Sequence, residues 1–202
     1  MDLTPIHRKL VLLEEIRDHV SLKSLIQCKL RARKKSAEIL RLFGRDQDTG
    51  DETAVVLFTS GTESNPKGVP LTHTNILSNH KSAFPLVELR RRDVMLGSIP
   101  PFHSFGLSVT GLFPLLSGVR VAFYPDPTNG RALARVCSSW QCTIACAPPT
   151  FLKGLIHAGS GGQLRCIRLF VSGAEKAPEE MFNQVKQVSP GSELIEGYGI
   201  TE

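Results

Sequence analysis

The sequence predicts an α/β protein in which a largely parallel sheet is preceded by a basic helical segment. From residue 53 onward, short apolar runs alternate with stretches of helix length, and this alternation is typical of βα units. Over the first 43 residues, apolar side chains instead recur at spacings of three and four, which is the helical period. The length of 202 residues suits one domain with a helical appendage.

Residues 5–43 are predicted to form two helices. Ser21 is a plausible cap between them, and Gly44 is a credible stop for the second. The apolar positions are Ile6, Leu10, Leu13, Ile16 and Val20 in the first helix, and Leu22, Leu25, Ile26 and Leu30 in the second. The polar stretch 46–52, DQDTGDE, indicates a linker. We therefore expect a basic helical segment with its linker over 1–52 and a separate domain over 53–202.

Positive charge is concentrated in the helical segment. From Arg8 to Arg45 there are eleven Lys/Arg against four Asp/Glu, about +7, whereas the whole chain carries +5. The run Lys29–Lys35 alone holds five basic residues. Two interpretations stay open: a solvated helix face, or a surface for an anionic membrane. We expect no nucleic-acid partner.

The cysteines and the hydropathy indicate a cytoplasmic protein, peripheral on the inner face of the cell membrane if the basic segment binds lipid. The five cysteines are an odd number without a disulfide framework spacing, and they fit a reducing compartment. We expect no zinc site at Cys142 and Cys146, because TIACA reads as a buried strand. The N-terminus has no signal-peptide core. Prolines interrupt the long stretch 94–119, so no transmembrane helix is expected.

Strands are predicted at 53–59, 94–99, 119–124, 142–147 and 167–172, and helices near 73, over 130–140 and over 178–188. In a parallel sheet, ligands gather where strands end and loops lead into helices. The loops after Phe58, Ile99, Val171 and Ile195 are therefore the expected site.

The loop after Phe58, within FTSGTESNPKGVPLTH (58–73), suits a phosphate group. It is not a Walker A loop, because Pro66 and Gly68 stand where that motif needs glycine and Ser/Thr. Small residues nevertheless expose backbone N–H groups, and hydroxyl groups and Lys67 add further donors. From composition alone, an ordinary polar turn is an equal alternative.

Four stretches in order make the chain resemble the adenylate-forming enzymes, which include acyl-CoA and acyl-carrier-protein synthetases, luciferases and peptide-synthetase adenylation domains. FTSGTESNPKG is similar to the phosphate loop of that family, PPFHSFG (100–106) to its PxFHxxG segment, SGAEKAP (172–178) to its adenine-pocket loop, and EGYGITE (196–202) to its YGxTE motif. The resemblance covers residues 53–202 and implies a partial N-terminal adenylation domain of the acyl-CoA synthetase-like fold. Within the family, the sequences FHSFGL, GAEK and EGYGITE, together with Glu63 in the loop, most resemble bacterial acyl-acyl-carrier-protein synthetases of the 2-acylglycerophosphoethanolamine acyltransferase type.

The resemblance implies an ATP-dependent acid–thiol ligase that forms AMP. A long-chain fatty acid would be joined to the α-phosphate of ATP and then transferred to a phosphopantetheine thiol of an acyl carrier protein, or alternatively of CoA. A catalytically dead nucleotide-binding or membrane-recruited module is the remaining alternative. Because two anions must meet, positive charge and N–H donors have to offset their repulsion.

The resemblance also assigns roles to individual residues, with ATP and Mg²⁺ as cofactors. The phosphate-binding residues would be Thr59, Ser60, Gly61, Thr62, Lys67 and Gly68, and Thr201 would contact the α-phosphate. The adenine pocket would consist of Gly173, Ala174, Glu175, Tyr198 and Gly199. Glu202 would bind Mg²⁺, which prefers hard oxygen ligands. His103 would lie beside the substrate carboxylate, so that His103, Lys67, Thr201 and Glu202 form the catalytic group.

Two further expectations concern the acyl chain and the end of the sequence. The alternating residues Phe105, Leu107, Val109, Leu112 and Phe113 could flank an acyl tunnel or simply pack in the core. Members of the family continue beyond YGxTE with a ribose-binding aspartate and a C-terminal lysine domain. We therefore expect this chain to be truncated, to bind ATP weakly and not to turn over alone.

Overall fold

The computed structural model describes residues 19–59, 66–159 and 161–201. The chain divides into two compact units, residues 1–49 and 50–202, which we describe separately. Among the described residues, no helix has the length and apolar character needed to cross a membrane.

The described part of the first unit contains two short helices, α3 (Leu22–Arg31) and α4 (Ser36–Leu42). Ser21 caps α3, as predicted, because its hydroxyl accepts from the Ser24 N–H at 3.1 Å. Gly44 follows α4 with a left-handed φ of 64°, which confirms it as the stop. The other predicted helix, over 6–20, lies almost wholly outside the described residues.

The prediction of one continuous helix after Ser21 was wrong. The interruption between α3 and α4 falls inside the basic run. A continuous helix would place Arg31 one turn from Lys35, and Lys29 one turn from Arg33, and such like-charged pairs are destabilising.

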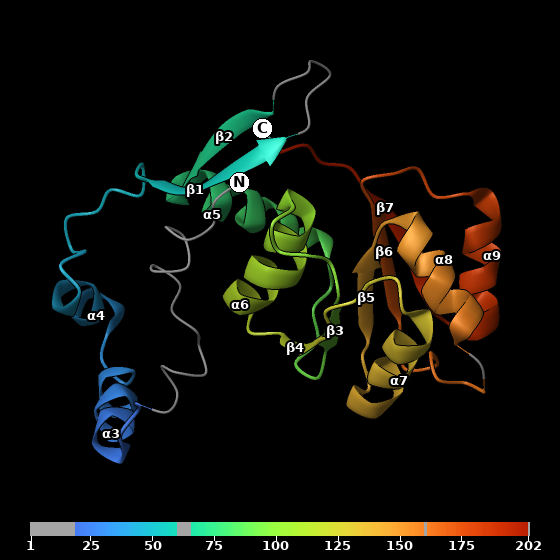
Figure 1. Ribbon diagram of the computed structural model, residues 1–202, viewed down its shortest axis with the longest axis horizontal. Helices are drawn as coiled ribbons and strands as arrows, with labels where there is room; N and C mark the ends of the chain where they lie inside the picture. The colour runs from blue at the N-terminus through green and yellow to red at the C-terminus, as the bar shows by residue number, and fades with distance from the viewer. Residues whose placement is uncertain (1–18, 60–65, 160, 202) are drawn as a thin grey trace, which may run out of the picture. The chain divides into compact units, whose positions relative to one another are not determined.

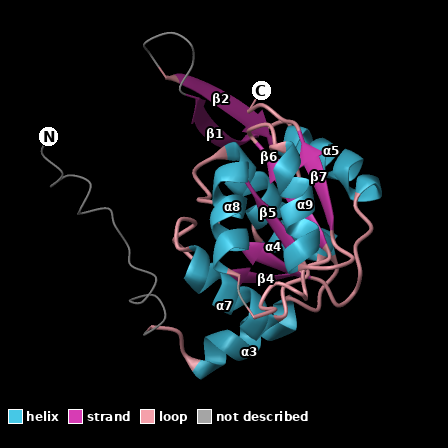
Figure 2. Cartoon of the chain, turned by 90° about the vertical axis from the view of Figure 1, so that its right-hand side faces the viewer, coloured by secondary structure: helices cyan, strands magenta, loops and turns pink. Residues whose placement is uncertain are grey.

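The second unit is built on a five-stranded sheet, which confirms the α/β fold. All neighbouring strands are parallel, in the order β4-β3-β5-β6-β7 (Figures 1 and 2). The strands are β3 (Val94–Gly97), β4 (Arg120–Phe123), β5 (Ile144–Ala147), β6 (Leu169–Gly173) and β7 (Glu193–Gly197). Their carboxyl ends consequently share one edge of the sheet.

Helices cover both faces of this sheet. The helices α7 (Gly130–Trp140), α8 (Pro149–Ala158) and α9 (Glu179–Val188) lie on one face (Figures 1 and 2). There they bury a core around Phe170 with Leu133, Leu152 and Met181. Alternate strand residues point to the other face, where Met95 and Ile144 pack with Phe113.

The second face is covered by helices that the sequence predicted only in part. Helix α5 (His73–Ala83) begins where it was predicted, because Thr72 and Asn75 form a reciprocal capping box. It leads into the short 3₁₀ turn η1 (Phe84–Leu86). The π-helical segment η2 (Gly106–Leu112) and α6 (Phe113–Ser117) follow β3. Residues 105–113, which alternate in sequence, are therefore helical.

The first predicted strand does not belong to the parallel sheet. β1 (Thr53–Thr59) pairs antiparallel with β2 (Lys67–Thr72) in a separate two-stranded sheet, so the predicted phosphate loop joins two strands of a hairpin. The expectation of a strand-to-helix loop here was wrong. β2 contains Gly68 and Pro70, residue types that weaken a strand signal, and this concealed it.

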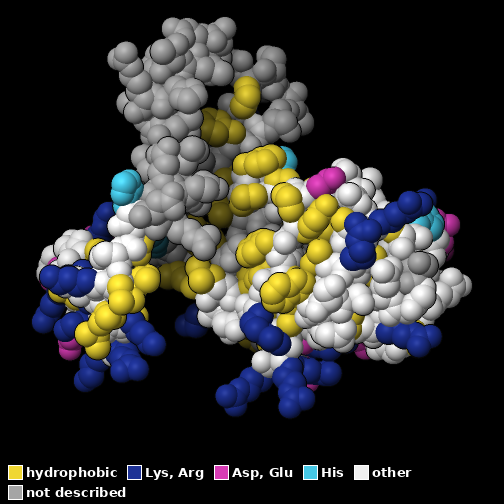
Figure 3. Space-filling view, turned by 60° about the horizontal axis from the view of Figure 1, so that its bottom comes forward, with side chains coloured by type: hydrophobic (Ala, Val, Ile, Leu, Met, Phe, Trp, Pro, Cys, Tyr) yellow, Lys and Arg dark blue, Asp and Glu magenta, His cyan; other side chains and the backbone are white. Residues whose placement is uncertain are grey.

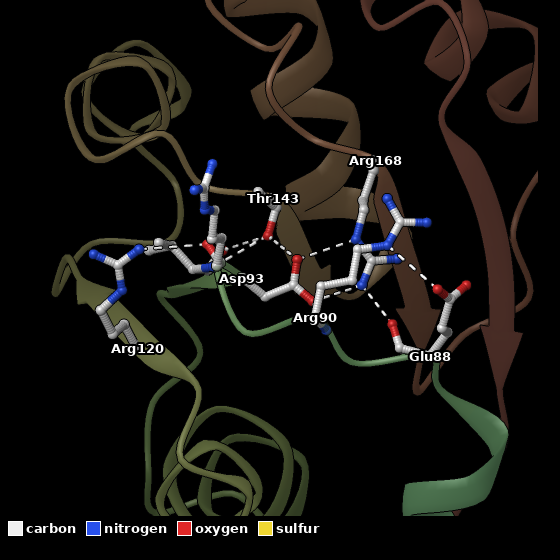
Figure 4. Close-up of polar contacts among 8 residues, drawn as sticks. Glu88, Arg90, Asp93, Arg120, Thr143 and Arg168 are labelled. Carbon is white, nitrogen blue, oxygen red and sulfur yellow. Dashed lines mark hydrogen bonds and ion pairs between the residues drawn. The ribbon is translucent and has the colours of Figure 1, made fainter.

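An ion-pair network fixes the opposite, amino edge of the sheet (Figure 4). Asp93, Thr143 and Arg168 stand just before β3, β5 and β6, respectively. Arg168 donates to both Asp93 carboxylate oxygens, at 2.6 and 3.1 Å, and the Thr143 hydroxyl donates to one of them at 2.7 Å. Burial alone would raise the pKa of Asp93. The hydrogen bonds from Arg168, Thr143 and the Arg90 N–H outweigh it and hold that pKa below its usual value.

Candidate functional site

Three of the four motif segments meet at the carboxyl edge of the sheet. PPFHSFG follows β3, SGAEKAP begins at the end of β6, and EGYGITE begins at the end of β7. Gly173 and Gly197 are register partners at the ends of β6 and β7. The hydroxyls of Thr201 and Ser104 are 3.2 Å apart, so the first and last of these segments are hydrogen-bonded across 97 positions of sequence.

Two adjoining cavities lie between these segments and helix α5. One, of about 240 Å³, is lined by Thr201, Ile200, Ser104 and residues of α5 and η2, and we call it the Thr201 cavity. The other, of about 230 Å³, is lined by Ser172, by both motif glycine turns and by Tyr198, and we call it the Ser172 cavity. Asn79, Ser104, Ser108 and Ile200 line both. Of the residues assigned to the adenine pocket, Gly173, Ala174, Tyr198 and Gly199 line the Ser172 cavity.

Ser172, which lines this cavity, has a hydroxyl group that sequence reasoning did not single out. It is fully buried and has no hydrogen-bond partner among the described residues. A buried hydroxyl without a partner is unfavourable unless something else supplies one. Its position as the first residue of SGAEKAP, at the end of a buried strand, was the available signal.

Backbone strain marks the same loop. Ala174 has a φ of +67°, in the left-handed region that residues other than glycine rarely adopt. Such strain costs of order 1–3 kcal/mol and persists only where the surroundings impose it. Here the Ala177 N–H donates to the Glu196 carboxylate at 2.8 Å, which fastens the loop to β7.

Two adenine-pocket candidates differ in their placement. Tyr198 lines the Ser172 cavity with a side chain that is 95% exposed, so its ring is available for stacking on a base. Glu175 is not among the residues that line this cavity. Its carboxylate instead accepts from the Thr150 hydroxyl at the start of α8, at 3.1 Å.

The structure describes the two ends of the predicted phosphate loop. Thr59 and Lys67 are register partners that close the hairpin, and Gly68 faces Phe58. Lys67 is exposed. Ser60, Gly61, Thr62, Glu63 and the candidate metal ligand Glu202 lie outside the described residues. In the described part of the chain, no group of three or more His, Cys, Asp or Glu could hold a metal ion.

His103 lies close to the hairpin strand. It lines a hollow of about 500 Å³ together with Leu107 and residues 55–58 of β1. Its ring stacks at a tilt on Phe102, with the ring centroids 4.5 Å apart. The fold thus brings the histidine of PPFHSFG beside the strand that leads into the phosphate loop.

An apolar cavity of about 490 Å³ adjoins the Ser172 cavity along α5 and the sheet. Val109 and Phe113 line it, together with Met95, Ile144, Cys146, Val171 and Ile195. Phe113 also belongs to the buried core. Phe113 therefore both lines the cavity that could hold an acyl chain and packs in the core, so both interpretations of these residues apply to it.

His80 of α5 links two of the elements around the Thr201 cavity. It is buried, with Nδ1 2.8 Å from the Ile76 carbonyl oxygen and Nε2 3.1 Å from the Ser108 carbonyl oxygen. The imidazole therefore ties α5 to η2, the two elements that line the Thr201 cavity.

Comparison with known proteins shows the family. The AMP-binding enzyme family matches residues 6–202, so the chain belongs to it. It is 33% identical over 155 residues to a medium-chain fatty-acid–CoA ligase of Escherichia coli, covering 76% of this chain and 27% of that protein. It is 30% identical over 161 residues to a long-chain-fatty-acid–CoA ligase of Bacillus subtilis, covering 77% and 28%. The chain thus spans about a quarter of the length of these curated relatives.

Solved structures support the same fold. The inhibitor-bound N-terminal domain of FACL13 from Mycobacterium tuberculosis superposes with a TM-score of 0.67 at 25% identity, over 77% of this chain and 39% of that one. ATP-bound MatB from Rhodopseudomonas palustris superposes with a TM-score of 0.63 at 26% identity, over 76% and 30%. The fold and the motif positions define a partial adenylation domain.

Proposed function

We propose that this chain forms the nucleotide site of a ligase that activates a fatty acid with ATP. The carboxylate would attack the α-phosphate, giving an acyl-adenylate and releasing pyrophosphate. The observation that carries the proposal is the Ser172 cavity at the carboxyl edge of the sheet, which residues of three of the four motif segments line together. The family match and the ATP-bound structural relative support it.

The donor set of this cavity fits an adenine nucleotide. The backbone at Gly173 and Ala174 offers polar groups to the cavity, while Tyr198 offers an aromatic face. A purine needs both, since its edge takes hydrogen bonds and its face takes stacking. Glu175, whose carboxylate accepts a hydrogen bond from Thr150, is a weaker candidate for contacting the adenine base.

The phosphates would extend from the Ser172 cavity toward the hairpin. Lys67 would offset their charge, with hydrogen-bond donors from Thr59, Ser60, Gly61, Thr62 and Gly68. Thr201 would contact the α-phosphate, and the Ser104 hydroxyl, 3.2 Å from it, orients its side chain. Glu202 would hold Mg²⁺, which supplies positive charge to the phosphate oxygens.

The acid would approach from the apolar side. A cavity of about 490 Å³ with mostly hydrophobic lining suits an acyl chain. His103 would position the carboxylate or supply local charge near the phosphate strand. The names of the relatives, medium-chain and long-chain fatty-acid–CoA ligases, support a fatty acid as substrate.

Two acceptors for the activated acyl group have support. The resemblance of FHSFGL, GAEK, EGYGITE and Glu63 to acyl-carrier-protein synthetases favours the phosphopantetheine thiol of an acyl carrier protein. The relatives named as CoA ligases favour CoA. Thioester formation by the longer enzyme to which we expect this chain to belong, measured with holo-carrier protein and with CoA at equal concentrations, separates them, because the preferred thiol will give the higher kcat/KM.

The adenylation step has its own test. In the longer enzyme to which we expect this chain to belong, ATP–pyrophosphate exchange should require both a long-chain fatty acid and Mg²⁺, and ATP should be converted to AMP. Formation of ADP would contradict the proposal, because it would mean transfer of the γ-phosphate. Failure of ATP to bind the chain in equilibrium titrations would contradict the assignment of the Ser172 cavity.

A further inference from the structure

Helix α3 carries an apolar stripe on a solvent-exposed surface. Leu22, Leu25, Ile26 and Leu30 recur at helical spacing, and their side chains are 74, 55, 53 and 58% exposed. No residue of α3 or α4 is buried. In a globular protein such a stripe normally faces a core. Here it is available to a partner.

The surroundings of the stripe are strongly basic. From Leu22 to Arg45 there are eight Lys/Arg against the single acid Glu38, a formal charge of +7. The whole chain carries +5, so the remainder sums to −2. One of these cations, Lys34, pairs with Glu38 at 3.1 Å, and Arg45 pairs with Asp48 at 3.3 Å. The positive charge is therefore concentrated in the segment 22–45.

Basic and apolar side chains are interleaved in a way that suits an interface between water and lipid. Lys29 stands three and four residues after Ile26 and Leu25, and therefore on the same face of α3. A lysine stem can lie along apolar surface while its ammonium group reaches the headgroup layer. Arg31, Arg33 and Lys35 follow directly. On the N-terminal unit, hydrophobic side chains are bordered by Lys and Arg (Figure 3).

We infer that the N-terminal unit docks on an anionic lipid bilayer. The stripe of α3 enters the boundary between headgroups and acyl chains, and the basic residues contact anionic headgroups. Leu40 and Phe43, 47 and 70% exposed on and beside α4, add apolar area. Charge complementarity identifies the occupant, because a bilayer offers an apolar interior beneath a continuous negative layer.

Membrane docking is independent of the proposed ligase activity. If the proposed function also holds, docking places the enzyme where an apolar acid is concentrated. Failure of either can be recognised separately, since vesicle binding requires no nucleotide and nucleotide binding requires no vesicle.

The test is co-sedimentation of the whole chain with vesicles. We expect binding to vesicles of phosphatidylcholine with about 30% phosphatidylglycerol, little binding to phosphatidylcholine alone, and weaker binding when salt is raised from about 0.1 to 0.5 M, since salt screens the attraction. Equal binding to neutral and anionic vesicles, or none to either, would overturn the inference.

Two paired variants separate the apolar and basic contributions. Leu25→Asp with Ile26→Asp should abolish binding to anionic vesicles. Lys29→Gln with Lys35→Gln should weaken partitioning about 30-fold, since each basic residue near the surface contributes about a factor of five. The matched control is Arg131→Gln with Arg135→Gln, which removes the same charge from exposed positions on α7. It should leave partitioning within about twofold.

Other occupants of the stripe would give different outcomes. A drop in melting temperature for Leu25→Asp with Ile26→Asp would show that the stripe packs against the protein itself. A concentration-dependent dimer that the same variant abolishes would show that it packs on a second copy. Equal loss of binding in the α7 control would show a response to net charge alone. Each of these results overturns membrane docking by α3.

Discussion

At the residue scale, buried hydroxyl groups distinguish the site from the scaffold. Ser189 is buried between α9 and the sheet, and its hydroxyl donates to the Ile167 carbonyl oxygen at 2.6 Å. Ser172 is equally buried but has no such partner among the described residues. The first arrangement stabilises the fold, whereas the second leaves a buried hydroxyl unpaired in a residue that lines the Ser172 cavity.

Ser172→Ala should therefore not lower stability, because the variant loses no hydrogen bond. Removal of a hydroxyl without a partner should leave the free energy of unfolding unchanged or slightly raised. Ser189→Ala is the matched control. It should lower stability by about 1–2 kcal/mol. Equal loss of stability in both variants, measured by urea unfolding, would contradict the absence of a partner for the Ser172 hydroxyl.

Lys67→Ala tests the phosphate loop. A charge-assisted contact to phosphate contributes about 1.5–3 kcal/mol, so the variant should bind ATP about 10- to 100-fold more weakly. Because the Lys67 side chain is exposed, the melting temperature of the variant should equal that of the natural chain. Lys186→Ala removes the same charge from an exposed position on α9 and should bind ATP normally. Unaltered ATP binding by Lys67→Ala would contradict the loop assignment.

Asp93 makes stability depend on acidity. Its pKa in the folded protein is lowered by Arg168, Thr143 and Arg90 despite burial, whereas an unfolded aspartate titrates near pH ~3.9. Because the unfolded chain protonates Asp93 at a higher pH than the folded chain does, the ionised Asp93 stabilises the folded protein above about pH 4. This stabilisation is lost as the pH falls further. Asp93→Asn should destabilise the protein by about 3 kcal/mol at neutral pH.

Urea unfolding at several pH values measures this effect. The difference between the natural chain and Asp93→Asn should be largest near pH 7 and should shrink below about pH 4. A difference that is constant with pH would mean that the network in Figure 4 does not contribute through the charge of Asp93.

At the element scale, the turn from β3 into η2 positions His103 and Ser104. It depends on a close backbone approach at Gly106. A Cβ placed there would overlap the Pro100 carbonyl oxygen and would lie 2.9 Å from that of Ile99. The glycine of PPFHSFG is therefore required by backbone packing, whatever the segment binds.

Gly106→Ala should destabilise the second unit by about 1–3 kcal/mol, because backbone atoms cannot move aside cheaply. Gly111→Ala is the control within the same helical segment. Its Cβ would meet only the Gly106 oxygen, at 3.6 Å, so it should be neutral or stabilise by about 0.5–1 kcal/mol. Thermal unfolding of both variants checks this. Equal destabilisation would mean that the described path of the turn is wrong.

At the scale of the whole molecule, thiol reactivity reports the packing of the second unit. Cys28 is exposed, Cys166 is partly buried, and Cys137, Cys142 and Cys146 are buried, all as free thiols. Burial raises the pKa of the Cys146 thiol to about 12 and raises that of Cys166 as well. The thiolate is the reactive form.

A thiol reagent at pH ~8 should therefore modify Cys28 quickly and Cys166 slowly. Cys137, Cys142 and Cys146 should react only after unfolding in guanidinium chloride. Mass spectrometry of the modified peptides checks the order. Rapid modification of Cys146 in the folded chain would contradict the burial of β5.

Much of the fold was predictable because it rests on local signals. Helix α7 occupies the predicted residues 130–140, and Ser21 and Thr72 cap helices that begin where expected. These features depend on neighbours within one or two turns. The parallel sheet was predictable too, because buried strands of four to five residues stand out as apolar runs.

The features that the sequence did not predict mainly involve contacts between distant residues. The pairing of β1 with β2 replaced a predicted strand-to-helix loop. His80 is buried because it meets Ser108 of η2, 28 residues away. The break between α3 and α4 is the exception, since it follows from like charges that the sequence itself displays.

By itself, the sequence determined the α/β class, the order of the motifs and the strand ends at which three of the four motifs lie. The tertiary structure alone decided which motif residues meet: Thr201 with Ser104, His103 with β1, and Ser172 with a cavity instead of a partner. The physical reason is that backbone propensity acts over a few neighbouring residues, whereas burial and hydrogen-bond pairing at a site depend on segments brought together from far along the chain.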